Sequence, residues 1–134
     1  EILWDLFAEG EHWRIAEHAE STLKTLRSRG YRLAVLSNND SRLRSVLEDH
    51  NITPLFEEIF ISSELGVEKP DPAIFRTVED KMKEKPDRFL HLGDSYSRDF
   101  MGAQKAGWSA LLYGLPIIEK SQITSFSELL DHLP

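Results

Sequence analysis

Two acidic residues stand where a metal-assisted reaction would need them. Asp94 follows Gly93 at the end of the apolar run 89–92, and Asp99 lies five residues later, at the expected start of a helix. A carboxylate at the end of a buried strand is well placed to bind a hard divalent cation such as Mg²⁺, which prefers oxygen ligands. The simpler interpretations are a turn residue for Asp94 and a helix N-cap for Asp99, a role that Asp99 could combine with support of the metal ligand.

A lysine and a Ser-Asn pair could bind the anion on which such a cation acts. Lys69 lies in a loop between Gly66 and Pro72 that contains two prolines, and a stiff main chain restricts where its ammonium group can go. Ser37 and Asn38 follow the apolar run 31–36, where a hydroxyl, an amide and the N–H groups of the next helix could hold a phosphate. Taken singly, these residues are better explained as a solvated surface lysine and an ordinary turn or cap.

Short apolar runs that alternate with amphipathic stretches predict the elements that position these residues. The pattern is typical of an α/β fold, in which a Rossmann-like parallel sheet has helices on both faces. Strands are expected at 31–36, 59–61, 89–92 and 108–113, and helices at 19–29, 41–50, 72–78 and 99–106, with a short last helix from Ser125. Ligands of open parallel sheets bind beyond the carboxyl ends of the strands, which is where Ser37, Asn38 and Asp94 fall.

Composition limits the classes of partner. The 134 residues carry a net charge of −7, which opposes binding to nucleic acid or to an anionic membrane surface. There is no cysteine, so disulfides and zinc–cysteine sites are excluded, and no apolar run has the roughly 20 residues needed to span a bilayer. We therefore expect one soluble intracellular domain with no nucleic-acid or membrane partner, in the cytoplasm or in an organelle.

In order, the motifs resemble those of the haloacid dehalogenase superfamily of hydrolases, and in particular its capped enzymes. They are the strand followed by Ser-Asn, then Gly-Val-Glu-Lys-Pro-Asp-Pro, then Leu-His-Leu-Gly-Asp-Ser-Tyr-Ser-Arg-Asp. The resemblance implies that Ser37, with Asn38 beside it, binds the phosphate of the substrate and that Lys69 steadies the phosphoryl group. It also implies that Asp94 binds Mg²⁺ and that Asp99 supports it as the second acid of the same motif.

The first motif of that family, a nucleophilic aspartate with a second acid two residues later, is not recognisable. The nearest string is Ile-Leu-Trp-Asp-Leu-Phe at residues 2–7, where Phe7 stands in place of the second acid. We therefore expect residues 1–15 to be a remnant of the cap domain or a connecting arm, and residues 16–134 to be a core that lacks its first central strand. An empty central position would leave main-chain groups unpaired, so a second copy, a separate chain or residues 2–7 should fill it.

The resulting functional prediction is a Mg²⁺-dependent phosphatase that acts on a small phosphorylated metabolite through an aspartyl-phosphate. This chain alone should be inactive and should bind Mg²⁺ weakly or not at all, because the nucleophile is missing. The alternative is a non-catalytic domain of the same fold that serves protein binding or assembly. A response-regulator receiver domain would need an acidic pair near the start of the chain, and a dinucleotide site would need Gly-x-Gly-x-x-Gly; neither is present. His91, between two leucines of a predicted strand, is expected to be a packed core residue.

Overall fold

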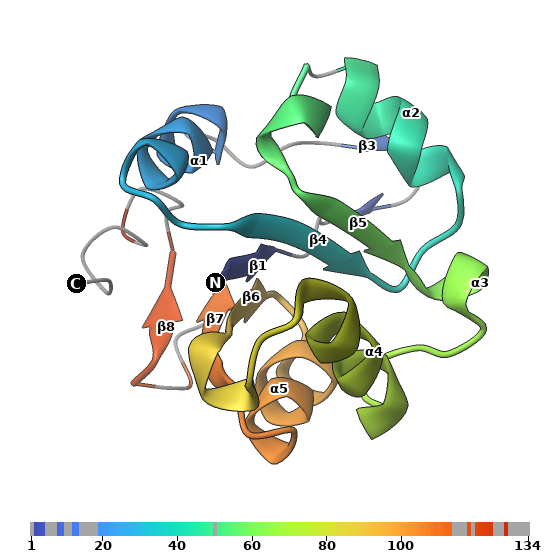
Figure 1. Ribbon diagram of the computed structural model, residues 1–134, viewed down its shortest axis with the longest axis vertical. Helices are drawn as coiled ribbons and strands as arrows, with labels where there is room; N and C mark the ends of the chain where they lie inside the picture. Colours follow the sequence, from blue (N-terminus) through green and yellow to red (C-terminus); the bar gives the residue numbers. More distant parts are fainter. Residues whose placement is uncertain are drawn as a thin grey trace.

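A parallel six-stranded sheet forms the centre of the computed structural model (Figure 1). The structure describes residues 2–4, 8–9, 12–13, 19–49, 51–113, 118, 120–124 and 128, and of residues 2–4, 8–9, 12–13 and 19 only the main chain. The strand order is β5-β4-β1-β6-β7-β8. Their bounds are β1 Ile2–Trp4, β4 Leu33–Ser37, β5 Glu58–Ile61, β6 Leu90–Gly93, β7 Ser109–Tyr113 and β8 Gln122–Ile123. The four strands expected from apolar runs are thus confirmed. β8 was not predicted, and β1 was predicted only as one of three candidates for the central position.

β1 occupies the position that was expected to be empty. Leu3 pairs in parallel with Ala34 of β4 on one side and with His91 of β6 on the other. The prediction that the first central strand is missing is therefore wrong for this sheet. One of the three candidates, residues 2–7, supplies three residues to the position, since unpaired main-chain groups between β4 and β6 would be costly to bury. The boundary at residue 15 stays a prediction, although residues 2–4 belong to the core sheet.

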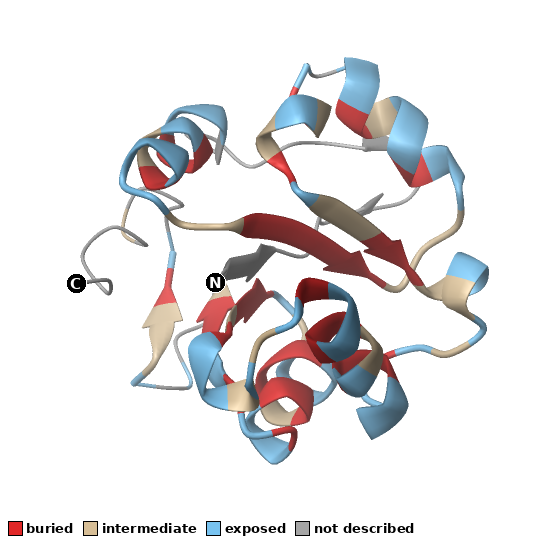
Figure 2. Cartoon of the chain, viewed as in Figure 1, coloured by how far each residue is buried: buried red, intermediate tan, exposed pale blue. Residues whose placement is uncertain are grey.

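Helices cover both faces of the sheet, as predicted. α1 (Ala19–Ser28) and α2 (Arg42–Asp49) lie on one face, and α4 (Pro72–Met82) and α5 (Gly102–Lys105) on the other (Figure 1). Side chains of β4 alternate between the two cores: Leu33 and Val35 pack with the residues of α1 and α2, Ala34 and Leu36 with those of α4. Because both faces are covered, β4 is buried along its whole length (Figure 2).

Local signals fixed most element ends. Asp71 caps α4 by accepting a hydrogen bond from the amide of Ala73, at 2.9 Å, and Pro72 is the first helical residue. Gly30 ends α1 with a φ of 89°, a conformation that suits glycine. The helix expected at 99–106 starts earlier, as a π-helical turn, η3 (Tyr96–Met101), that leads into α5. Short 3₁₀ turns, η1 (Thr53–Leu55) and η2 (Pro86–Arg88), precede β5 and β6, and α3 (Ser62–Leu65) follows β5.

Two short strands lie within residues 1–15, which were expected to be a remnant of the cap domain or a connecting arm. β2 (Ala8–Glu9) and β3 (His12–Trp13) pair in antiparallel fashion as a separate two-stranded sheet. The helix predicted from Ser125 falls mostly on residues outside those described. Within the described ranges, no helix has the length and apolar character needed to cross a bilayer.

Candidate functional site

Lys69 is a buried cation at the carboxyl edge of the sheet. It lies in the loop between α3 and α4, but its side chain turns inward and is only 1% exposed. Its ammonium donates to Oδ1 of Asp99 at 2.5 Å and to the main-chain carbonyl of Leu36, in β4, at 3.2 Å. The interpretation of Lys69 as a solvated surface lysine is therefore wrong. Lysine is seldom fully buried without a partner, and here the partner is the predicted second acid.

Asp99 is the centre of this cluster. Its Oδ1 receives the ammonium of Lys69 and lies 3.2 Å from Nε2 of His91, while its Oδ2 accepts the amide of Ser95 at 2.9 Å. Burial alone would raise the pKa of the Asp99 carboxyl. The hydrogen bond from His91 and the charge of Lys69 outweigh that effect and hold this pKa below its ordinary value. Asp99 is therefore ionised at neutral pH. It lies within η3, whose N-cap is Ser95, so the interpretation of Asp99 as a helix N-cap is wrong.

A close approach of main chain to side chain explains Gly93. A Cβ atom at this position would lie 2.3 Å from Cγ and Oδ2 of Asp99, closer than any packed structure allows. Only glycine lets the end of β6 pass so near the carboxylate. Gly93 and Asp99 are thus one steric unit, which the Gly-Asp-x-x-x-x-Asp string in the sequence encodes.

Ser37 and Asn38 lie where they were predicted, at the end of β4. Ser37 is buried, and its hydroxyl receives a hydrogen bond from the side-chain amide of Asn39 at 3.3 Å. The Asn38 side chain bonds instead to the main chain of Lys69, through both its nitrogen and its oxygen. The structure therefore connects Asn38, Lys69 and Asp99 directly, with Ser37 as the neighbour of Asn38 in the chain.

Asp94 directly follows β6 and lies at the same edge of the sheet as Ser37, because all strands of the sheet are parallel. Unlike Asp99, Asp94 is exposed. Partial loss of solvent and then the negative charge of Asp99 raise the pKa of the Asp94 carboxyl above its ordinary value. An anion that is disfavoured in this way gains from a nearby cation, which fits the predicted role of Asp94 in binding a metal.

The fit of Mg²⁺ to the described residues is partial. Within the part of the chain that the structure describes, no group of three or more Asp, Glu, His or Cys side chains is arranged to hold a metal ion. Asp94 offers one exposed carboxylate, whereas Asp99 is occupied by Lys69, His91 and Ser95. One carboxylate with water molecules is a weak site for Mg²⁺.

His91 has a role that was not predicted. It is buried, as expected, with edge-to-face contacts to Phe75 and Trp108. In addition, its Nε2 contacts the same oxygen of Asp99 that binds Lys69. The signal was present in the sequence, since His91 and Gly93 are two residues apart in a strand and therefore face the same side, toward Asp99.

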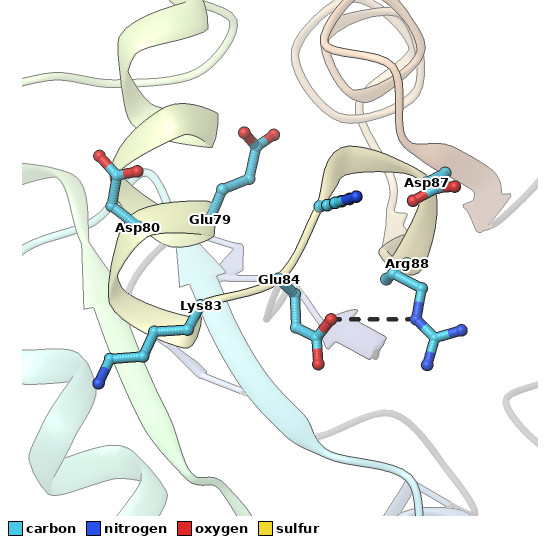
Figure 3. A pocket seen from close by; sticks show the side chains of 7 residues that line it. Glu79, Asp80, Lys83, Glu84, Asp87 and Arg88 are labelled. Carbon is cyan, nitrogen blue, oxygen red and sulfur yellow. Dashed lines mark ion pairs between the residues drawn. The ribbon is translucent and has the colours of Figure 1, made fainter.

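The structure also has a charged hollow of about 560 Å³. Figure 3 shows the side chains that line it. Its lining comes from the carboxyl end of α4 and from η2, and includes Glu79, Lys83, Glu84 and Arg88. Lys69 precedes the opposite, amino end of α4. Glu79 accepts a hydrogen bond from the indole of Trp108, at 2.7 Å. None of the predicted site residues lines the hollow.

Comparisons with known proteins agree with the motif order. A family model described as haloacid dehalogenase-like hydrolase matches residues 1–107. Haloacid dehalogenase-like hydrolase domain-containing protein 3 of Bos taurus is 38% identical over 116 residues, which are 87% of this chain and 46% of the relative. Glyceraldehyde 3-phosphate phosphatase of Methanothermobacter thermautotrophicus is 38% identical over 100 residues, 74% of this chain and 44% of that protein.

A solved structure supports the fold assignment. The putative HAD-hydrolase YfnB from Bacillus subtilis, bound to magnesium, superposes with a TM-score of 0.79 at 25% identity and covers 89% of this chain and 56% of that chain. The match to haloacid dehalogenase-like hydrolase domain-containing protein 3 also confirms the branch of the superfamily that the motifs indicate. The chain spans about half the length of the curated relatives it matches.

Proposed function

Because the chain belongs to the haloacid dehalogenase-like hydrolase family, we propose that it carries one part of the site of a Mg²⁺-dependent phosphatase. The substrate class is a small phosphorylated molecule, and neither nucleic acid nor a membrane surface is a partner. The observation that carries the proposal is the buried Lys69–Asp99 pair at the edge of the sheet where Ser37 ends β4 and Asp94 follows β6. A relative that is named a glyceraldehyde 3-phosphate phosphatase supports the same chemistry.

Each residue has a physical role in this proposal. The Lys69 ammonium, fixed by Asp99, supplies positive charge near a phosphoryl group at the sheet edge. The Ser37 hydroxyl offers a hydrogen bond to a phosphoryl oxygen. Asp94 would hold Mg²⁺ together with water; when bound, the ion neutralises charge on the transferred group. With one carboxylate, we expect the chain alone to bind Mg²⁺ weakly.

The nucleophile is the missing part. In the proposed reaction a carboxylate attacks phosphorus, the bond from phosphorus to the leaving oxygen breaks, and water later hydrolyses the aspartyl-phosphate. Asp5 directly follows β1 in the sequence but lies outside the described residues, and Phe7 stands where the second acid is needed. We therefore expect little or no phosphatase activity from this chain alone, and we propose that a second chain or segment supplies the acid pair.

Phosphatase assays with an aryl phosphate and Mg²⁺ test the proposal. The chain alone should stay at the background rate. Adding a separately expressed segment that contains a strand and the acid pair, such as the amino-terminal part of the bovine relative, should restore turnover. Restored turnover should be lost again with Lys69→Met or Asp94→Asn. The segment would compete with β1, whose pairing extends over only three residues on each side.

Two outcomes would contradict the proposal. Robust turnover by the chain alone, lost with Asp94→Asn, would refute the prediction of inactivity, and its loss with Asp5→Asn would identify Asp5 as the nucleophile. Binding of the segment with no turnover would favour the alternative, a non-catalytic domain that serves protein binding or assembly.

A further inference from the structure

The Asn38 side chain holds the main chain of Lys69 at two points. Nδ2 of Asn38 donates to the carbonyl oxygen of Lys69 at 3.0 Å, and Oδ1 of Asn38 accepts the amide of Lys69 at 2.9 Å. The two residues are 31 positions apart, so this contact belongs to the tertiary structure and not to a local turn. A pair of hydrogen bonds in opposite directions fixes the orientation of the Lys69 main chain as well as its distance.

The other end of Lys69 is held by the same strand. Its ammonium donates to the carbonyl of Leu36, two residues before Asn38, and to Asp99. β4 and Asn38, the residue after it, therefore form hydrogen bonds with both the main chain and the ammonium group of Lys69. A lysine side chain has several rotatable bonds, and fixing the position of its charge requires that its main chain be fixed too.

We propose that Asn38 is a positioning residue that sets the location of the Lys69 ammonium through its main chain, in place of the substrate-binding role predicted from the Ser-Asn string. Both polar atoms of its amide are directed to Lys69, and no described contact directs them elsewhere. The consequence for catalysis rests on the proposed function. The position of Lys69 itself is measurable without any substrate.

A neighbouring contact provides a matched control. Asn39, which follows Asn38 in the loop between β4 and α2, is bonded to α3. Its main-chain N–H donates to Oγ of Ser62 at 3.0 Å, and that hydroxyl donates to the main-chain carbonyl of Asn39 at 3.2 Å. Ser62→Ala therefore removes two hydrogen bonds from the same loop, as Asn38→Ala does, but none that involves Lys69. General loosening of the loop should affect both variants equally.

The test uses nitrogen-15 labelled chain and two NMR signals of Lys69, its main-chain amide and its ammonium. Asn38→Ala should speed hydrogen exchange of the Lys69 amide on the order of tenfold relative to Ser62→Ala, and should shift or broaden the ammonium signal. Asn38→Asp keeps the acceptor and loses the donor, so amide protection should persist while the ammonium signal changes. Lys69→Met assigns that signal.

Unchanged Lys69 signals in Asn38→Ala would overturn the proposal, as would an equal change in Ser62→Ala. If Asn38→Ala does not fold, Asn38→Asp carries the test, because it preserves the shape of the side chain. Phosphatase activity enters neither result, so failure of this proposal and failure of the proposed function are distinguishable.

Discussion

Replacing Asp99 by Asn should destabilise the chain strongly, because it removes the counter-charge of a buried lysine. The side chains of Lys69 and Asp99 are each 1% exposed, so water cannot replace the lost carboxylate. Breaking a buried ion pair by removing one partner typically costs about 3–5 kcal/mol. We expect about 3 kcal/mol for Asp99→Asn, because the amide oxygen of Asn can still accept one hydrogen bond, from Lys69 or from Ser95.

This loss is large relative to the whole stability of such a domain, which is about 5–15 kcal/mol. It is measured by urea unfolding at neutral pH, followed by far-ultraviolet circular dichroism. The double variant Lys69→Met/Asp99→Asn removes both charges and should be more stable than Asp99→Asn alone. Glu20→Gln, in an exposed pair with Lys24, is the control, and its effect should not exceed about 0.5 kcal/mol.

A cost below about 1 kcal/mol for Asp99→Asn would refute this reasoning, since a surface pair would give that value. The reasoning would also be refuted if Lys69→Met/Asp99→Asn were less stable than both Lys69→Met and Asp99→Asn, because the two charges would then not be stabilising each other.

Three further predictions follow from the same cluster. The pKa of Asp99 is lower in the folded chain than in the unfolded chain, so the unfolded chain takes up the proton first as pH falls. The parent chain should therefore lose stability below about pH 4. Asp99→Asn should lack this part of the loss, and urea unfolding at several pH values measures both. Gly93→Ala should cost about 1–3 kcal/mol, because its Cβ would displace the Asp99 carboxylate; a urea midpoint equal to that of the parent would contradict this. Asp94→Asn should leave the free energy of unfolding unchanged or raise it, because the ionised form of Asp94 is disfavoured in the fold. The same variant should abolish the NMR shifts that Mg²⁺ induces. A less stable variant or persistent shifts would show that Asp94 is not the ligand.

Regular elements were predictable because their signals are local. The apolar run of β4 and the Asp-Pro start of α4 depend on residues that are adjacent in the chain. Contacts that build the site are not local: Asn38 meets Lys69 across 31 residues, and Lys69 meets Asp99 across 30. Only the rigid loop around Lys69 hinted that its side chain is constrained, and nothing in that loop indicated burial.

The error at β1 has a physical cause as well. A three-residue strand carries almost no periodicity, and its place in the sheet is decided by the pairing that β4 and β6 offer. Family resemblance predicted an empty position from the missing motif, whereas the cost of unpaired main-chain groups favours whichever segment can reach it. His91 illustrates the converse: strand alternation predicted its burial but not which buried group it would meet.

Binding of inorganic phosphate with Mg²⁺ tests most directly the claim that this chain holds part of a phosphoryl-transfer site. The measurement is an NMR titration of the labelled chain at millimolar phosphate, with Asp94→Asn as the control. The site described above predicts amide shifts that are concentrated at Ser37, Lys69 and Asp94 and weakened in the control. Shifts confined to the hollow around Lys83 and Arg88, or no shifts at the edge of the sheet, would contradict it.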